Sequence, residues 1–191
     1  MKKLLFVVAL MLTSLSVNAQ GSNWTVEAGV GFSSLVGDDT KGDKSLFSYK
    51  VGVTYDLALA ENFYIIPGLE LVNKGFKEDG ITGNINMFYA QIPVLVAYKF
   101  PIADEIKLAI KAGPYASYGV LGSDIQYTGS KKVNVFDSSM FDRFNWGAKA
   151  GISVDFDQFS IGFEYSRGFK KLNSKVDAYH QVFGAVFGFK F

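Results

Sequence analysis

The feature that most constrains this chain is a period of two in its apolar residues. From Trp24 to Phe32, for example, every second side chain is apolar, and the residues between them are polar or glycine. Successive side chains of a β-strand point to opposite faces, so this pattern predicts strands with one apolar face. The pattern recurs over residues 24–32, 47–59, 63–71, 88–100, 106–118, 144–156, 159–169 and 179–191. We therefore expect an all-β fold of eight strands.

The connections between these strands alternate in length. Short ones are expected at residues 60–62, 101–105 and 155–158, and longer polar ones at residues 36–45, 76–86, 120–140 and 170–177. In the longest, alternation on both sides of Gly129 and Ser130 predicts a further hairpin. Short turns at one end and long loops at the other are typical of outer-membrane barrels. This predicts an eight-stranded antiparallel up-and-down transmembrane β-barrel with short periplasmic turns, longer extracellular loops and both termini in the periplasm.

A soluble eight-stranded barrel of the lipocalin type is the alternative, because its strands alternate as well. The two classes differ in the face that carries charge. Here one face of every strand is almost free of charge, with Arg167 as the clear exception, while the other face carries glycine, serine and single charges. Aromatic residues also gather toward the strand ends, as in the girdles of membrane barrels. The pattern favours the outer membrane as the location.

The amino-terminal residues predict export. Lys2 and Lys3 precede an apolar stretch at residues 4–17, which is too short for a membrane-spanning helix and is followed by Val17-Asn18-Ala19. This is the pattern of a signal peptide, with cleavage expected after Ala19. An uncleaved anchor helix is the alternative. We expect residues 1–19 to be the signal peptide and residues 20–191 to be the barrel domain.

Charge and cysteine content exclude several functions. Without Lys2 and Lys3 the chain has 17 basic and 18 acidic residues, a net charge of −1, which argues against a nucleic-acid partner. The chain contains no cysteine, which excludes disulfides, thiolate chemistry and a cysteine-linked lipid anchor.

The inner face of the predicted barrel carries charges of both signs. Eight strands leave an interior that side chains fill, which excludes a wide pore, and buried charges must be paired. We therefore expect an ion-pair network in the lumen, and a narrow path for a small polar solute is the alternative. Lys99, Lys107 and Lys190 are predicted to face inward as well. The predicted network comprises Glu27, Lys50, Asp56, Glu70, Lys111, Lys149, Asp155 and Glu164.

Catalytic and metal chemistry have little support in the sequence. His180 is the only histidine, and Ser174 or Ser166 with Asp177 or Glu164 would complete a triad with it, as in an outer-membrane lipid hydrolase. No nucleophile-elbow sequence accompanies these residues, so no enzyme activity is expected. One histidine and no cysteine predict no transition-metal site, and the acids of the first loop do not match a calcium-binding pattern. We expect no cofactor.

Several segments resemble the PorT-like outer-membrane β-barrel family of Bacteroidetes. They are NAQ at the end of the signal peptide, IPVLVAYKF at 92–100, AGPYASY at 112–118, NWGAKAGISVDF at 145–156 and the phenylalanine-terminated last strand. The resemblance covers nearly the whole mature chain. It implies an outer-membrane barrel, with a secretion-associated or porin-like role, and it defines no catalytic or binding residues.

The last strand ends in three alternate phenylalanines, Phe187, Phe189 and Phe191. They are predicted to face lipid and to act as the signal read by the barrel-assembly machinery. Other expected partners are outer-membrane lipid or lipopolysaccharide and an extracellular ligand at the loops. The expected function is a structural or surface-interaction role through the extracellular loops. A porin-like channel and a secretion-associated component are the alternatives.

Overall fold

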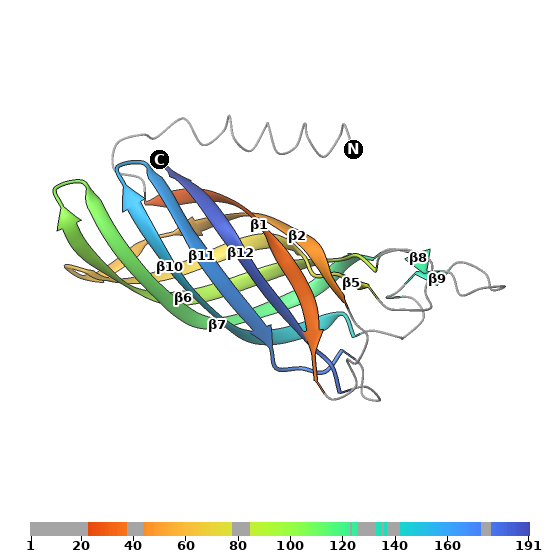
Figure 1. The fold of residues 1–191 in the computed structure, drawn as a ribbon. Helices are drawn as coiled ribbons and strands as arrows, with labels where there is room; N and C mark the ends of the chain where they lie inside the picture. Colours follow the sequence, from red (N-terminus) through yellow and green to blue (C-terminus); the bar gives the residue numbers. More distant parts are fainter. Residues whose placement is uncertain are drawn as a thin grey trace.

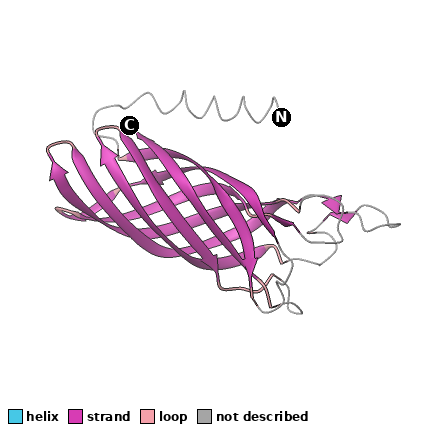
Figure 2. Cartoon of the chain, viewed as in Figure 1, coloured by secondary structure: helices cyan, strands magenta, loops and turns pink. Residues whose placement is uncertain are grey.

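The computed structural model describes residues 23–37, 44–77, 85–122, 124–125, 133–134, 136, 142–172 and 177–191. The predicted signal peptide lies outside this part of the chain. The elements described are strands, joined by turns (Figures 1 and 2). They are β1 (Trp24–Val36), β2 (Lys44–Tyr55), β3 (Leu57–Ala60), β4 (Phe63–Asn73), β5 (Phe76–Lys77), β6 (Met87–Ala103), β7 (Ile106–Gly122), β8 (Asp124–Ile125), β9 (Val133–Asn134), β10 (Phe144–Phe156), β11 (Phe159–Gly168) and β12 (Tyr179–Lys190).

The sheet closes on itself. Its order is β3-β4-β6-β7-β10-β11-β12-β1-β2-β5, and β2 also pairs with β4. Strands β2 and β3 are two parts of one strand interrupted at Asp56, and β5 follows β4 after a break of two residues. The described residues therefore form a barrel of eight antiparallel wall strands, and the predicted fold class is confirmed.

The period of two in the sequence becomes the two faces of this wall. Along β6, for example, Gln91 and Lys99 are buried inside, while Ile92 and Tyr98 are exposed on the outer surface. The outer surface carries most of the large apolar side chains, which suits contact with lipid. Among the described residues, no helix has the length and apolar character needed to cross a membrane.

The two ends of the barrel differ as predicted. At the short-turn end, the three turns lie at residues 61–62, 104–105 and 157–158, and Asp157 has a φ of 50°, which Asp tolerates better than most residues. Phe191 lies at the same end, where its backbone N–H donates to the carbonyl oxygen of Trp24 at 3.0 Å. At the opposite, long-loop end, β8 pairs with β9, as expected for the hairpin in the longest connection.

Strands β6 and β7 are longer than the alternation suggested. Each has 17 residues, and β7 continues to Gly122, beyond the expected start of the loop at residue 120. The two strands pair along most of their length, from Met87 opposite Gly122 to Ala103 opposite Ile106. Their extra residues therefore extend the wall beyond its neighbours, with backbone hydrogen bonds supplied by this pairing.

The barrel closes where β1 meets β12, and two glycines face each other there. Gly31 pairs with Gly184, and a Cβ atom on Gly31 would collide with the carbonyl oxygen of Phe183 and the Cα atom of Gly184. Both obstacles are backbone atoms, which cannot rotate away. Glycine at position 31 therefore permits the close approach of the first and last strands.

We predict that Gly31→Ala weakens closure of the barrel. The added methyl group must displace backbone, which should lower the free energy of unfolding by about 1–3 kcal/mol. Urea titration of the protein folded into lipid vesicles measures this change. Gly188→Ala is the matched control on β12, because its Cβ atom would first meet the rotatable Ser160 hydroxyl group. Equal unfolding midpoints for the two variants would contradict the prediction.

Candidate functional site

Three glutamates and three lysines from six wall strands meet inside the barrel. Lys50 Nζ lies 2.6 Å from Glu164 Oε2, 2.9 Å from Glu27 Oε2 and 3.1 Å from Glu70 Oε1. A single ammonium group thus contacts all three carboxylates. We call these residues the central cluster: Glu27, Lys50, Glu70, Lys111, Lys149 and Glu164.

The other two lysines complete the central cluster. Lys149 Nζ donates to both carboxylate oxygens of Glu70 at 2.6 Å and lies 3.3 Å from Glu164 Oε2. Lys111 Nζ lies 2.7 Å from Glu164 Oε1 and 3.4 Å from Glu27 Oε1. Gln91 Nε2 also donates to Glu70 Oε2, at 3.0 Å. The three positive and three negative charges balance, as buried charges require.

Glycines on the neighbouring strands make room for these long side chains. Gly52 pairs with both Glu27 and Glu70, Gly29 pairs with Lys50, and Gly151 pairs with both Lys111 and Glu164. A Cβ atom on Gly52 would lie 2.8 Å from Glu70 Cγ, and one on Gly29 would lie 3.0 Å from Lys50 Cγ. The glycines on the inner face, which have no side chain, therefore leave the space that the charged side chains occupy.

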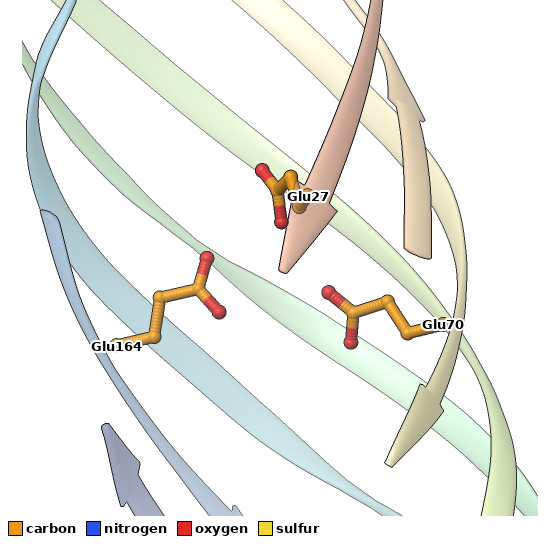
Figure 3. A group of neighbouring side chains, drawn as sticks. All are labelled: Glu27, Glu70 and Glu164. Carbon is orange, nitrogen blue, oxygen red and sulfur yellow. The ribbon is translucent and has the colours of Figure 1, made fainter. Parts of the chain in front are cut away.

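The three glutamates point toward one another, as Figure 3 shows. Their nearest carboxylate oxygens all lie within 4.8 Å of one another, a spacing that could hold a metal ion. The lysine amines already bind these oxygens and supply an equal positive charge. A divalent cation would have to displace them and would leave their buried charges uncompensated. The arrangement suits an internal ion-pair network better than a metal site.

Two of the eight residues predicted for the network lie apart from the central cluster. Asp56 and Asp155 share Lys99, whose Nζ atom lies 2.6 Å from Asp56 Oδ2 and 2.9 Å from Asp155 Oδ2. We call these three residues the basal cluster. Lys190 Nζ lies 3.6 Å from Asp56 Oδ2. The inward parity of Lys99 was visible in the sequence, but its partners were not.

A polar cavity of about 230 Å³ lies at the short-turn end. Its lining runs from Glu105 and Asp157, in or beside the turns, to Glu27 and Lys111 of the central cluster. The interior therefore has a cavity with room for several water molecules at this end. Packed, ion-paired side chains lie further in.

The long-loop end of the interior is closed by apolar side chains. Phe136 packs edge-on against Tyr89 with ring centroids 5.8 Å apart, and Phe76 forms an isolated bridge with Ile85. All of these side chains are buried. We call this group the apolar lid: Leu35, Phe76, Ile85, Met87, Tyr89, Phe136, Leu172 and Ala178.

Lys74 is a buried cation that the sequence reading missed. Its Nζ atom lies 4.4 Å from the ring centroid of Tyr115 and 5.1 Å from that of Tyr89, and it donates to Ser117 Oγ at 3.4 Å. The Lys74 amine is thus contacted by aromatic rings through cation–π interactions, whereas the lysines of the central cluster are contacted by carboxylates. Lys74 has the same parity as Glu70 and Val72, so extending the expected strand past residue 71 would have placed it inside.

The residues of the possible hydrolase triad are not linked in the described part of the chain. His180 is buried, with its ring 5.6 Å from that of Tyr89, and neither ring nitrogen has a hydrogen-bond partner there. Glu164 is paired with lysines, and Asp177 Oδ1 lies 3.3 Å from Lys171 Nζ. Ser174 lies outside the described residues. No serine hydroxyl is therefore held against His180 among the residues described.

The three carboxy-terminal phenylalanines lie on the outer surface at the short-turn end. Phe187 and Phe189 both contact Phe159 of the neighbouring strand, with centroid distances of 5.9 and 5.3 Å, and Phe189 contacts Phe191 at 5.1 Å. This places a group of aromatic rings where the chain ends.

We predict a strong energetic coupling between Glu70 and Lys149. Glu70→Gln and Lys149→Met each leave an uncompensated buried charge and should each cost about 3–5 kcal/mol of the free energy of unfolding. The double variant restores charge balance and should lose clearly less than the sum of the two. Urea titration in lipid vesicles gives the three values.

The surface pair Lys170 and Asp142 is the control for this cycle. Its charged atoms are 3.0 Å apart, but both side chains are more than a third exposed. Lys170→Met should therefore change the free energy of unfolding by less than about 1 kcal/mol. Additive losses at Glu70 and Lys149 would show that the central cluster is not a coupled network.

Comparisons with known proteins agree with this architecture. The outer membrane enzyme PagL superposes with a TM-score of 0.56 at 14% sequence identity, over 87% of this chain and 99% of that one. Neisserial surface protein A superposes with a TM-score of 0.51 at 14% identity, over 90% of this chain and 100% of that one. At such identities the similarity concerns the fold alone. No curated protein matches the sequence.

A family model supplies the assignment that these distant structures cannot. The model for the outer membrane protein beta-barrel domain matches residues 18–174, which is most of the chain. Together with the closed barrel and its apolar outer face, this match also supports the predicted location. The chain belongs to the outer membrane protein beta-barrel domain family, and it is an outer-membrane β-barrel protein.

Proposed function

We propose that this protein is a closed barrel that serves the outer membrane through its structure and through surface contacts of its loops, without catalysis. The observation that carries the proposal is that paired and apolar side chains occupy the lumen beyond the cavity at the short-turn end. The central cluster, the basal cluster and the apolar lid occupy successive levels of the lumen. A barrel of eight strands has little interior space beyond what such side chains fill.

The loops at the long-loop end are the proposed contact surface, above all the connection between β7 and β10. Part of this connection also has a structural role, because Phe136 is buried in the apolar lid. The segment between β8 and β9 in the same connection is the part to which we assign contact with an extracellular ligand. The proposal therefore separates Phe136, which closes the lumen, from the segment 126–132, which carries the interaction.

The proposal includes an orientation and a route of export. The long-loop end faces the outside and both termini face the periplasm, which follows the usual topology of bacterial outer-membrane barrels. Residues 1–19 act as the signal peptide. Phe187, Phe189 and Phe191 act as the signal for the barrel-assembly machinery, and their position on the outer surface at the chain end supports this role.

The absence of catalysis is part of the proposal. A triad needs a serine or other nucleophile within hydrogen-bonding distance of its base. His180 is instead buried with its ring against that of Tyr89, a member of the apolar lid. This environment supports a packing role for the histidine. PagL is an enzyme on the same fold, but fold similarity does not carry its chemistry to this chain.

A finer family placement suggests one alternative role. The motifs at residues 92–100, 112–118 and 145–156 support placement in the PorT-like group of Bacteroidetes, and with it a secretion-associated function. A narrow porin-like channel is the other alternative, and the polar cavity at the short-turn end favours it. Both alternatives predict phenotypes that the closed barrel does not.

We predict that the wild-type protein gives no discrete conductance steps in planar lipid bilayers. We expect the paired side chains of the central cluster to block the passage of ions through the narrow lumen. A variant with Lys50, Glu70, Lys149 and Glu164 all replaced by serine keeps the net charge, empties part of the lumen and should conduct, so it serves as the positive control. Wild-type steps whose size changes in Lys111→Gln would support the channel instead.

We predict that a deletion strain separates the remaining roles. It would be complemented with wild type, with a loop variant in which 126–132 is replaced by glycine and serine, and with the Lys111→Gln variant. The loop variant should fold, because Phe136 and the wall are retained. It should fail to reverse the phenotype of the deletion strain, because the proposed contact segment is replaced. Protein secretion, uptake of small solutes and the lipid profile would be measured in parallel. Full complementation by the loop variant would contradict a contact role for this segment.

A further inference from the structure

A polar row crosses the outer surface of β1, β12 and β11 near the long-loop end. Ser34 pairs with Gln181, and Gln181 pairs with Arg167, so the three residues lie side by side on adjacent strands. Their parity places them on the outer face, which is apolar in the rows beneath. The next row toward the short-turn end is Phe32, Phe183 and Tyr165. The next row toward the long-loop end is Val36, Tyr179 and the exposed Phe169, so the polar row lies between two rows of aromatic side chains.

Hydrogen bonds organise the polar row around Gln181. Its Nε2 atom donates to Ser34 Oγ at 2.9 Å, and its Oε1 atom accepts from the Tyr165 hydroxyl group at 3.2 Å. Arg167 is exposed, and its guanidinium group has no hydrogen bond or ion pair with the residues described. The nearby cations Lys170 and Lys171 are paired with Asp142 and Asp177. Arg167 thus differs from its neighbours in presenting a whole guanidinium group outward.

The position of Arg167 restricts the anion that it can bind. A cation on the lipid face is costly near the bilayer midplane and tolerated near the interface. The polar row lies beside the aromatic side chains of Tyr165, Tyr179 and Phe169, a setting typical of that interface. The guanidinium group is planar and binds phosphate through two parallel hydrogen bonds. The anions found at this level are the phosphates of lipid headgroups.

A shallow apolar groove of about 290 Å³ lies on the same three strands, beneath the polar row. Ala28, Val30, Ile161 and Phe187 line it around Ala185, whose small side chain leaves the space. Ala185 pairs with Val30 on one side and Phe163 on the other. Gln181 and Ala185 are four positions apart, which is about 14 Å along a strand. With the usual tilt, the groove lies about 10 Å deeper in the bilayer than the polar row.

We propose that the outer face of β11, β12 and β1 binds one phosphate-bearing lipid of the adjacent leaflet. Arg167 holds the headgroup phosphate, Gln181 and Tyr165 offer polar contacts beside it, and an acyl chain occupies the groove over Ala185. The vertical order of cation and groove matches that of phosphate and acyl chain in a lipid. This inference rests on the proposed orientation in one respect, because the orientation decides which leaflet supplies the lipid. With the long-loop end outside, that lipid is lipopolysaccharide.

Titration of the purified full-length protein in detergent with lipid A, followed by native mass spectrometry, tests this site. Lipid A carries the phosphates and acyl chains of lipopolysaccharide. Arg167→Gln should weaken binding at least tenfold, and Arg167→Lys should recover part of the loss, because lysine keeps the charge without the paired donors. Ala185→Leu should weaken binding several-fold by filling the groove. Lys171→Gln is the matched control and should bind like wild type.

Competition with inorganic phosphate distinguishes a lipid site from a site for free anions. A large excess of phosphate should leave lipid A bound to the wild type. Displacement by phosphate, together with unchanged binding in Ala185→Leu, would overturn the lipid assignment. Equal binding by wild type and Arg167→Gln would overturn the role of Arg167.

Folding and conductance controls keep these outcomes interpretable. Heat-modifiable migration in gels identifies folded barrels, and if Arg167→Gln does not fold, Arg167→Lys and Ala185→Leu decide the question. Unweakened binding in both would overturn the proposal. Because Arg167 lies outside the lumen, its replacement should not change conductance. Failure of the lipid site can therefore be told from failure of the closed-lumen proposal.

Discussion

The pairing of β1 with β12 is the constraint on which the rest of the structure depends. A membrane offers no water to unpaired N–H and C=O groups, so a sheet can cross it only when its edges are joined. Twelve residue pairs join these two strands, from Thr25 opposite Lys190 to Val36 opposite Tyr179. Closure turns one face of every strand toward lipid and the other toward a narrow interior. The glycine pair at positions 31 and 184 allows this approach.

Closure also creates the problem that the interior solves. Charged side chains on the inner face are confined to the narrow lumen, where an unpaired charge would be costly, so they pair with one another. The central cluster balances three lysines against three glutamates, and glycines on adjacent strands give these side chains room. At the long-loop end a buried lysine is accommodated differently, because Lys74 contacts the rings of Tyr115 and of Tyr89 in the apolar lid instead of carboxylates. The interior is thus polar and ion-paired in its centre and apolar at one end.

The side chains on the outer surface also change with their level in the membrane. Aromatic rings gather at the short-turn end around Phe159 and Phe189, and the polar row of Ser34, Gln181 and Arg167 crosses the opposite end. The sequence showed Arg167 only as an exception to an uncharged face. Its alignment with Ser34 and Gln181 depends on the registers of two strand pairs, one of which joins residues nearly 150 positions apart. Such long-range register cannot be read from local alternation.

Local chemistry along the chain was sufficient to determine the class of fold, the number of wall strands and the face on which most strand side chains lie, although not that of Lys74. These properties follow from the period of two and from the lengths of the connections, which involve only near neighbours in the sequence. The tertiary structure alone decided which residues meet: Lys50 with three glutamates, Asp56 and Asp155 with Lys99, Phe136 with the lid, and Ala185 with the groove below Arg167. The physical reason is that parity assigns a side chain to a face, whereas its neighbours on that face are set by strand register and barrel closure.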